Sequence, residues 1–326
     1  MSDLKQRILQ AVAPDLAAIE TALAANLNPH LDLVRDVAGH IVFSGGKRLR
    51  PLLMVLSARV CGYAGDYDKT FSTALEYLHA ATLLHDDLVD GAALRRGKPA
   101  AHLKYGSSVA VLVGDFLLAR ALSVSAATGS AKIVRLLAEL TEQMSQGEVH
   151  QLMRKGDVRL TEAEYFEVIR RKTAVLFETA CRVSAVLADA PEERELALAA
   201  YGRHLGMAFQ IADDLFDYTA ATPELGKEIG ADLREGKLTL PLIHALGHAA
   251  ADEREWMVGV VQDPHFTADD FHRLVDRMRR LGSIRYAEET AEGFIAKAKA
   301  ALAGFPDSAA LATLHDIADY ALHRRA

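Results

Sequence analysis

Two aspartate clusters with the pattern D-D-x-x-D are the best candidates for chemistry in this sequence; one starts at Asp86 and the other at Asp213. In a helix, residues four positions apart share a face, so Asp86 would lie beside Asp90 and Asp213 beside Asp217. Like charges at this spacing cost about 0.2–0.5 kcal/mol per pair, so folding alone gives no reason to repeat them. A hard cation does, because Mg²⁺ binds one or two carboxylates and completes its octahedron with waters and substrate phosphates. The candidate metal ligands are Asp86, Asp87, Asp90, Asp213, Asp214 and Asp217.

Two basic segments could bind the phosphate groups that such cations accompany. Lys47 and Arg50 lie in segment 44–51, S-G-G-K-R-L-R-P, where the glycines would let the backbone approach an anion. Arg95 and Arg96 follow the first aspartate cluster and could supply charge-assisted hydrogen bonds. Segment 44–51 lacks the first glycine of a P-loop. Taken alone, segment 44–51 is more typical of a solvated basic turn. Arg95 and Arg96 fit a phosphate-binding role and simple charge balance with the preceding aspartates equally well.

A histidine lies two helical turns before the first aspartate cluster. Glu76 and His79 form the pattern E-x-x-H, which occurs in di-iron bundles, but a di-iron site needs two copies and the sequence has one. On its own, His79 is more typical of a core histidine with a satisfied hydrogen bond. The dipeptide His85-Asp86 also occurs in metal-dependent phosphohydrolases, but that interpretation leaves the second aspartate cluster unexplained.

Further polar residues surround the second cluster or interrupt apolar patterns. Lys172 and Thr173 lie in an otherwise apolar helical segment, and Gln210 lies one turn before the second aspartate cluster. Lys227 and Lys237 follow that cluster. Each lysine alone fits a surface position. Together they would place cations around two carboxylate-bearing helices, as a site for two diphosphates and Mg²⁺ requires.

The elements that must position these residues are helices. Alanine and leucine recur at helical spacing, and segments that contain glycine or proline separate the patterns. The predicted helices include 66–90, 108–127, 131–154, 161–187, 191–219 and 240–251. Strand patterns are nearly absent and linkers are short, so we predict an all-α bundle of about ten or more helices. We expect residues 1–326 to form a single domain in which the two aspartate clusters face each other.

Composition argues against several classes of protein. A net charge of −7 argues against a nucleic-acid binder. Cys61 and Cys181 lie in different apolar patterns, which favours buried free thiols and a reducing compartment. Residues 1–27 form an amphipathic pattern interrupted by Pro14, without the continuous apolar stretch of a signal peptide. No stretch indicates a membrane span, so we expect a cytoplasmic protein.

In combination, the motifs resemble those of the trans-polyprenyl diphosphate synthases. The resemblance covers about residues 45–241 and rests on G-G-K-R-x-R-P, D-D-x-x-D with R-R-G, K-T, F-Q-x-x-D-D-x-x-D and G-K-L-T-L-P. It implies an isoprenoid-synthase-type helical bundle around a central cavity, usually as a homodimer. It also implies a prenyltransferase that adds isopentenyl diphosphate head-to-tail to an allylic diphosphate, with farnesyl diphosphate as the expected primer. Mg²⁺ and basic side chains would assist departure of pyrophosphate, and the isopentenyl double bond would attack the carbocation.

The resemblance assigns roles residue by residue. Asp86 and Asp90 would ligate Mg²⁺ with Asp87 in support, and Asp213 would hold a further ion whose waters Asp214 and Asp217 order. About three ions would be present with substrate bound. The residues expected at the allylic diphosphate are Arg95, Lys172, Gln210, Lys227 and Lys237. Those expected at isopentenyl diphosphate are Lys47, Arg50, His79 and Arg96. Thr173 would stabilise the carbocation through its hydroxyl and backbone carbonyl dipoles.

The residues before the first motif predict the product length. Thr82, Ala81 and Leu78 precede Asp86 by four, five and eight positions, on or beside the same helical face. Short-chain members of the family commonly place an aromatic floor there, and none of the three is aromatic. The resemblance is strongest to octaprenyl-type synthases, which implies a product of about eight isoprene units for a quinone side chain. Products of nine or ten units stay open as alternatives, because the residue that closes the product tunnel would lie on another helix, near Phe116 or Leu117.

Three alternatives stay open beside the long-chain synthase. A short-chain farnesyl or geranylgeranyl diphosphate synthase is the main one. A class I terpene cyclase uses related metal motifs but has no need of a second diphosphate site, so Lys47, Arg50 and Arg96 argue against it. A noncatalytic synthase subunit would usually lose carboxylates from one motif, and both are complete here. The lipid product leaves room for transient membrane contact.

Overall fold

The protein is almost entirely helical in the computed structural model, which describes residues 2–219 and 230–323. The first helices are α1 (Ser2–Leu27), α2 (Asp32–Val42), α3 (Leu49–Val60), α4 (Tyr67–Val89), α5 (Ala101–Tyr105), α6 (Ser107–Ala126) and α7 (Ala131–Met153). The middle of the chain forms α8 (Glu162–Ile169), a π-helical turn η1 (Arg170–Ala174), α9 (Val175–Leu187) and α10 (Glu192–Thr219). The remaining helices are α11 (Ala231–Arg234), α12 (Leu240–His248), α13 (Ala251–Gln262), α14 (Ala268–Arg280), α15 (Ser283–Ala301) and α16 (Ala309–His323). The prediction of an all-α fold is confirmed.

One short hairpin is the only β-structure among the described residues. Strand β1 (Leu94–Arg95) pairs antiparallel with β2 (Lys98–Pro99), directly after the first aspartate motif. The turn contains Arg96 and Gly97, both at positive φ. The hairpin turns the chain back toward the end of α4, which explains how Arg95 reaches that helix.

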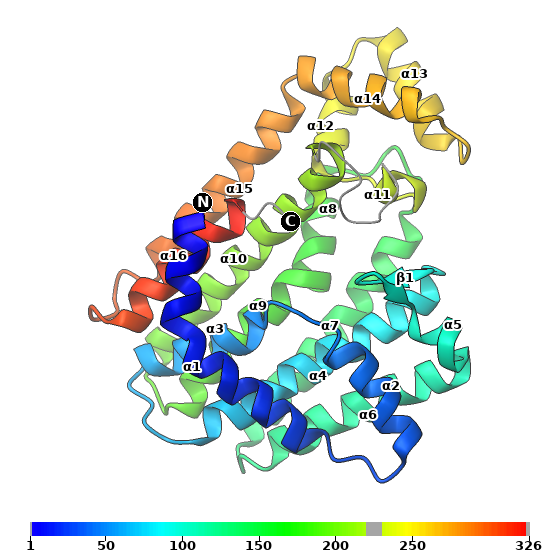
Figure 1. Ribbon diagram of the computed structural model, residues 1–326. Helices are drawn as coiled ribbons and strands as arrows, with labels where there is room; N and C mark the ends of the chain where they lie inside the picture. The colour runs from blue at the N-terminus through cyan, green and yellow to red at the C-terminus, as the bar shows by residue number, and fades with distance from the viewer. Residues whose placement is uncertain (1, 220–229, 324–326) are drawn as a thin grey trace.

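Two apolar clusters make up the core, and the long helix α10 contributes to both. The larger cluster joins α1, α3, α4, α6, α7, α9 and α16 with residues of α10 such as Leu198 and Leu205. The smaller one joins α8 and α12 to α15 with residues such as Ile211 and Leu215. Helices α12 to α14 lie at one end of the molecule and α2, α5 and α6 at the other (Figure 1). The second aspartate motif lies on the part of α10 that packs in the smaller cluster.

Helix α6 has apolar residues on more faces than its neighbours bury. It packs along α4, yet Leu112 and Leu122 stay exposed.

Helices α1 and α6 are both long and apolar enough to span a membrane by length and composition. Core helices of soluble proteins pass the same test, and both helices pack on the larger apolar cluster here. The expected absence of a membrane span stays a prediction.

Three helix predictions were wrong in detail. Segment 161–187 is not one regular helix, because η1 separates α8 from α9. Pro14 does not interrupt the N-terminal helix, which runs continuously through it. The helix predicted for 240–251 ends at His248, and the backbone turns extended at Ala249. A capping box of Thr161 and Glu164 begins α8.

Candidate active site

The first aspartate motif ends α4, where its middle carboxylate is buried. Asp87 is only 1% exposed. Arg95 of the hairpin donates from Nε to Asp87 Oδ1 at 2.8 Å. Asp87 Oδ2 is buried without a hydrogen-bond partner among the described residues. Because the Arg95 guanidinium supplies the countercharge, this pair anchors the hairpin to the motif.

Lysines surround the last carboxylate of the first motif. Asp90 accepts from Lys155 Nζ at 3.0 Å and from Lys237 Nζ at 3.4 Å. Burial alone would raise the pKa of Asp90, but Lys237 and Lys155 hold it below its ordinary value. Lys237 contacts Glu235 as well, and its pKa is raised because these carboxylates outweigh the effect of burial. The chain thus gathers cations from the turn after α7 and from the α11–α12 loop at one aspartate.

The first carboxylate of the motif has an acidic neighbour on α7. Burial raises the pKa of Asp86 to about 6, and the charges of Glu148 and Asp90 add to the rise while Lys172 opposes it. Glu148 forms an ion pair with Lys172. A divalent cation would relieve this crowding of carboxylates, which together with the free Asp87 oxygen fits an oxygen-ligated Mg²⁺ site.

The second motif, on α10, distributes its three carboxylates differently. Asp213 is exposed, whereas Asp214 is 6% exposed. Asp217 accepts from the backbone N–H groups of Ala231 at 3.1 Å and Asp232 at 3.2 Å, and so holds the start of α11. Burial and then the charge of Asp232 raise the pKa of Asp214. Its hydrogen bonds oppose that rise, and a cation held at Asp213 would do so too.

The π-helical turn η1 carries Lys172 and Thr173 against two glycines of neighbouring helices. A Cβ at Gly147 of α7 would lie 2.8 Å from the backbone nitrogen of Lys172. A Cβ at Gly206 of α10 would lie 2.6 Å from Cα of Ala174. Side chains at these glycines would push the turn out of place. Such π-turns are often found at functional sites, and sequence periodicity did not reveal this one.

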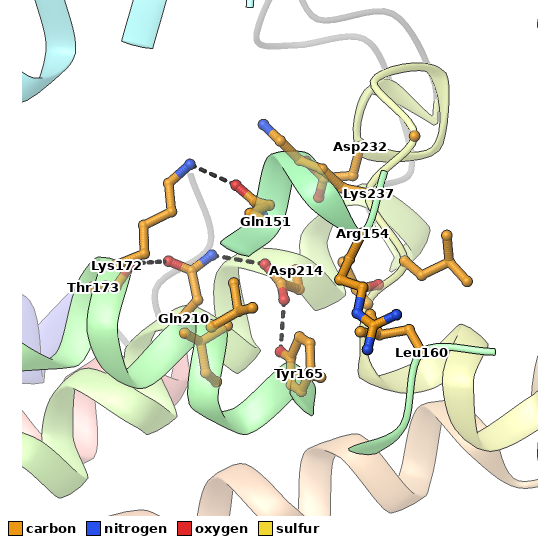
Figure 2. Close-up of a pocket in the computed structure, with 15 residues that line it drawn as sticks. Gln151, Arg154, Leu160, Tyr165, Lys172, Thr173, Gln210, Asp214, Asp232 and Lys237 are labelled. Atoms are coloured by element: carbon orange, nitrogen blue, oxygen red, sulfur yellow. Dashed lines mark hydrogen bonds between the residues drawn. The ribbon is translucent and has the colours of Figure 1, made fainter. Parts of the chain in front are cut away.

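Side chains of η1, α7 and α10 converge in a cavity of about 110 Å³. Figure 2 shows Lys172 reaching Gln151, and Gln210 lying between Thr173 and Asp214. Lys172 Nζ donates to Gln151 Oε1 at 2.6 Å, and Thr173 Oγ1 donates to Gln210 Oε1 at 2.7 Å. Lys237 lines the same cavity. Four residues expected from the sequence, namely Lys172, Thr173, Gln210 and Lys237, are thus brought together.

Two of the residues expected at isopentenyl diphosphate, Arg50 and Arg96, lie near His79. Burial lowers the pKa of His79 well below its ordinary value, and the charges of Arg50 and Arg96 lower it further. The Arg50 guanidinium lies 5.1 Å from the centre of the Phe177 ring. Lys47 is exposed, with Nζ 6.0 Å from the centre of the Tyr320 ring. A neutral histidine among arginines suits the neighbourhood of an anion.

The loop before α3 positions these cations through a buried arginine in the left-handed conformation. Arg48 has φ 46°, and its guanidinium bonds Glu20 at 2.6 Å and Glu76 at 2.9 Å. Glu76 is therefore the partner of Arg48, which excludes the di-iron interpretation of E-x-x-H. Arg96, also in the left-handed region, donates to the carbonyl oxygen of Gly45. This bond joins the two basic segments that the sequence placed far apart.

The predicted chain-length residues lie on α4, behind the first motif. Leu78 and Ala81 are fully buried in the larger apolar cluster. Thr82 is partly buried and donates to the carbonyl oxygen of His79 at 2.8 Å. Leu117 of the adjacent α6 is buried and Phe116 partly so. Lys227, expected near the allylic diphosphate, lies outside the described residues.

Sequence reasoning missed four residues that contact the site. Glu148 and Gln151 lie three residues apart on α7 and bind Lys172, and Lys155, in the turn after α7, binds Asp90. The spacing of three places Glu148 and Gln151 on one helical face and could have identified them. The fourth is Tyr165, whose hydroxyl bonds Asp214; nothing in its sequence context distinguishes it from a core tyrosine.

Comparison with known proteins agrees with this geometry over nearly the whole chain. The profile of the polyprenyl synthetase family matches residues 31–278. The octaprenyl diphosphate synthase of Escherichia coli is 39% identical over 322 residues, which cover 98% of each chain. A polyprenyl synthase from Caulobacter crescentus, solved with calcium and isoprenyl diphosphate, has a TM-score of 0.92 and 41% identity, covering 98% of each chain. A decaprenyl diphosphate synthase from Rhodobacter capsulatus has a TM-score of 0.92 and 38% identity, again over 98% of each chain.

These matches are long enough and similar enough to assign a family. The identities exceed 35% and extend from end to end of the similar proteins. The resemblance inferred from the motifs is confirmed, as is the isoprenoid-synthase type of fold. The chain belongs to the polyprenyl synthetase family.

Proposed function

We propose that this protein is a long-chain trans-prenyltransferase that adds isopentenyl diphosphate repeatedly to an allylic diphosphate. The observation that carries the proposal is the gathering of Lys155, Lys172 and Lys237 around two complete aspartate motifs. Such a site can bind a diphosphate and its cations together. The similarity to octaprenyl and decaprenyl diphosphate synthases supports a product of about eight units, with farnesyl diphosphate as primer and a quinone side chain as its destination.

Divalent cations fit the carboxylates of both motifs. Asp86 and Asp90 would hold Mg²⁺ on one side with Asp87 in support, and Asp213 on the other, where Asp214 and Asp217 would order its waters. Asp87 Oδ2 and the crowding of Asp86 by Glu148 provide the place for positive charge. The Caulobacter relative, which was solved with calcium, supports a divalent site. When bound, Mg²⁺ neutralises charge that develops on the leaving pyrophosphate.

The side chains of the protein bind and orient the two substrates. Lys172 and Lys237 can donate to the allylic diphosphate from the cavity that Gln210 also lines. Arg95 can donate to it from the hairpin. Lys47, Arg50 and Arg96 would bind isopentenyl diphosphate beside neutral His79. Thr173 lines the cavity with Lys172 and Lys237 and would present its oxygen to the carbocation. No side-chain base stands out among the described residues of the site, so released pyrophosphate would take the proton.

A homodimer is the assembly that the surface supports. Exposed Leu112 and Leu122 on α6 and Val149 and Met153 on α7 are apolar residues that a second copy of the chain would cover. We place the enzyme in the cytoplasm, with transient membrane contact when its lipid product departs.

Product sizing tests this function. The enzyme is incubated with Mg²⁺, labelled isopentenyl diphosphate and farnesyl diphosphate, and the dephosphorylated products are separated by length. We expect a main product of about eight units. Products of three or four units would identify a short-chain synthase, and turnover of the allylic substrate alone would identify a terpene cyclase. No incorporation of label would overturn the proposal.

A further inference from the structure

A continuous chain of hydrogen bonds joins Tyr165 to Thr173. Tyr165 of α8 donates from its hydroxyl to Asp214 Oδ2 at 2.6 Å. Gln210, one turn earlier on α10, donates from Nε2 to Asp214 Oδ1 at 2.7 Å. Thr173 of η1 donates to Gln210 Oε1 at 2.7 Å. Figure 2 shows the four side chains in this order, with Tyr165 at the end away from Lys172.

The chain has one direction in the structure. Both oxygens of Asp214 accept hydrogen bonds, so Gln210 turns its NH₂ group toward Asp214. The amide oxygen of Gln210 then faces Thr173 and takes its single hydroxyl proton. Both lone pairs of Thr173 Oγ1 are consequently available to a positive charge in the cavity. A reversed amide would instead point the hydroxyl proton of Thr173 into the cavity and repel a cation.

We propose that Tyr165 is a positioning residue for the condensation: by fixing Asp214, it sets the Gln210 amide and turns the lone pairs of Thr173 toward the carbocation. The inference rests on the role proposed above for Thr173. Tyr165 is 3% exposed, and its hydroxyl satisfies one oxygen of a buried carboxylate. Without that hydroxyl, Asp214 Oδ2 would lose its donor, and the carboxylate would turn and release Gln210.

The substitution Tyr165→Phe tests the inference, because it removes the hydroxyl and keeps the ring. Tyr201→Phe is the matched control: Tyr201 is equally buried and donates to the carbonyl oxygen of Leu314 at 2.8 Å, outside the chain. We would measure the single-turnover rate of the first condensation, the KM of each substrate and the Tm. The same substitutions are repeated in a Thr173→Val background, in which no hydroxyl remains to be oriented.

We expect Tyr165→Phe to slow the first condensation about tenfold, which is the size of one hydrogen bond to a charged group. The KM of isopentenyl diphosphate should change less than about twofold, because its expected contacts, Lys47, Arg50 and Arg96, lie outside the hydrogen-bond chain. In the Thr173→Val background, Tyr165→Phe should have almost no further effect on the rate.

Two results would overturn the inference while the wild-type enzyme still elongates farnesyl diphosphate. One is a Tyr165→Phe rate equal to that of Tyr201→Phe. The other is an equal slowing in both backgrounds, which would assign Tyr165 to general stability; a fall in Tm without coupling to Thr173 would agree with that result. Failure of the wild-type enzyme to elongate would instead contradict the proposed function.

Discussion

The buried middle carboxylates of the two aspartate motifs have different partners: a guanidinium holds Asp87, whereas neutral groups hold Asp214. Asp87 bonds a guanidinium and Asp90 two ammonium groups. At the equivalent positions, Asp214 bonds a phenol and an amide, and Asp217 bonds backbone N–H groups. The same five-residue pattern thus places its buried middle carboxylate in two different electrostatic settings.

This difference indicates different roles for the two motifs. The cations at the first motif are already placed to move from carboxylate to diphosphate oxygens when substrate and metal arrive. The neutral donors at Asp214 supply no countercharge, so a cation nearby would stabilise its ionised form. We infer that the first motif binds and ionises the allylic diphosphate, while the second anchors a metal and the Thr173 hydrogen-bond chain.

The largest expected effect is loss of catalysis in Asp86→Asn. Asp86 lies among Lys172, Glu148 and Asp90, where the amide would bind a divalent cation far more weakly. We expect kcat to fall by about a thousandfold, since electrostatic stabilisation of the leaving group is the main catalytic term. Asp115→Asn, on the exposed face of α6, is the control and should retain wild-type activity. If Asp86→Asn retained more than a tenth of the wild-type activity, the catalytic role inferred for the first motif would be contradicted.

The two buried middle aspartates should differ in how much their partners stabilise the fold. Arg95→Gln leaves Asp87 without its countercharge, and we expect a loss of about 2 kcal/mol, because the exposed side of Arg95 lets water compensate in part. Tyr165→Phe removes a neutral donor from Asp214 and should cost about 1 kcal/mol. Urea unfolding of both variants measures the two losses. A larger loss of stability in Tyr165→Phe than in Arg95→Gln would contradict this expectation.

The basic cluster near the first motif should give stability a pH dependence. His79 stays neutral in the folded protein because burial and Arg50 lower its pKa. Below about pH 6.5 the unfolded chain takes up this proton and the folded chain does not, so stability falls with falling pH. His79→Gln should remove a slope of up to about 1.4 kcal/mol per pH unit between pH 6.5 and 5. Parallel stability profiles for the two proteins, measured by urea unfolding, would contradict this assignment.

Only the first motif should share its helix with the product chain. Ala81 lies five residues before Asp86, and Ala208 five before Asp213, and both are fully buried. We expect Ala81→Phe to shorten the product while Ala208→Phe lowers activity without changing product length, because only α4 would line the path of the chain. If the Ala81→Phe enzyme made products of wild-type length, α4 would not determine product length.

Much of this architecture could be predicted from the sequence, and what escaped has physical reasons. Apolar periodicity predicted the long helices well, because burying one face is what stabilises them. It failed at η1, where Gly147 and Gly206 allow a close approach that no residue spacing records. Motifs identified Asp86 and Asp213 as ligand candidates. Their different surroundings depend on residues such as Arg95 and Tyr165, whose contacts are set only by the tertiary fold.

The central claim is that both aspartate motifs hold metal at one diphosphate site, and counting bound Mn²⁺ tests it most directly. Mn²⁺ replaces Mg²⁺ in the presence of inorganic pyrophosphate, and the bound ions are measured per protomer by electron paramagnetic resonance. We expect about three ions in the wild-type protein, one fewer in Asp213→Asn, and the remaining sites lost when Asp86 and Asp90 are both replaced by Asn. An unchanged count in either variant would contradict the account.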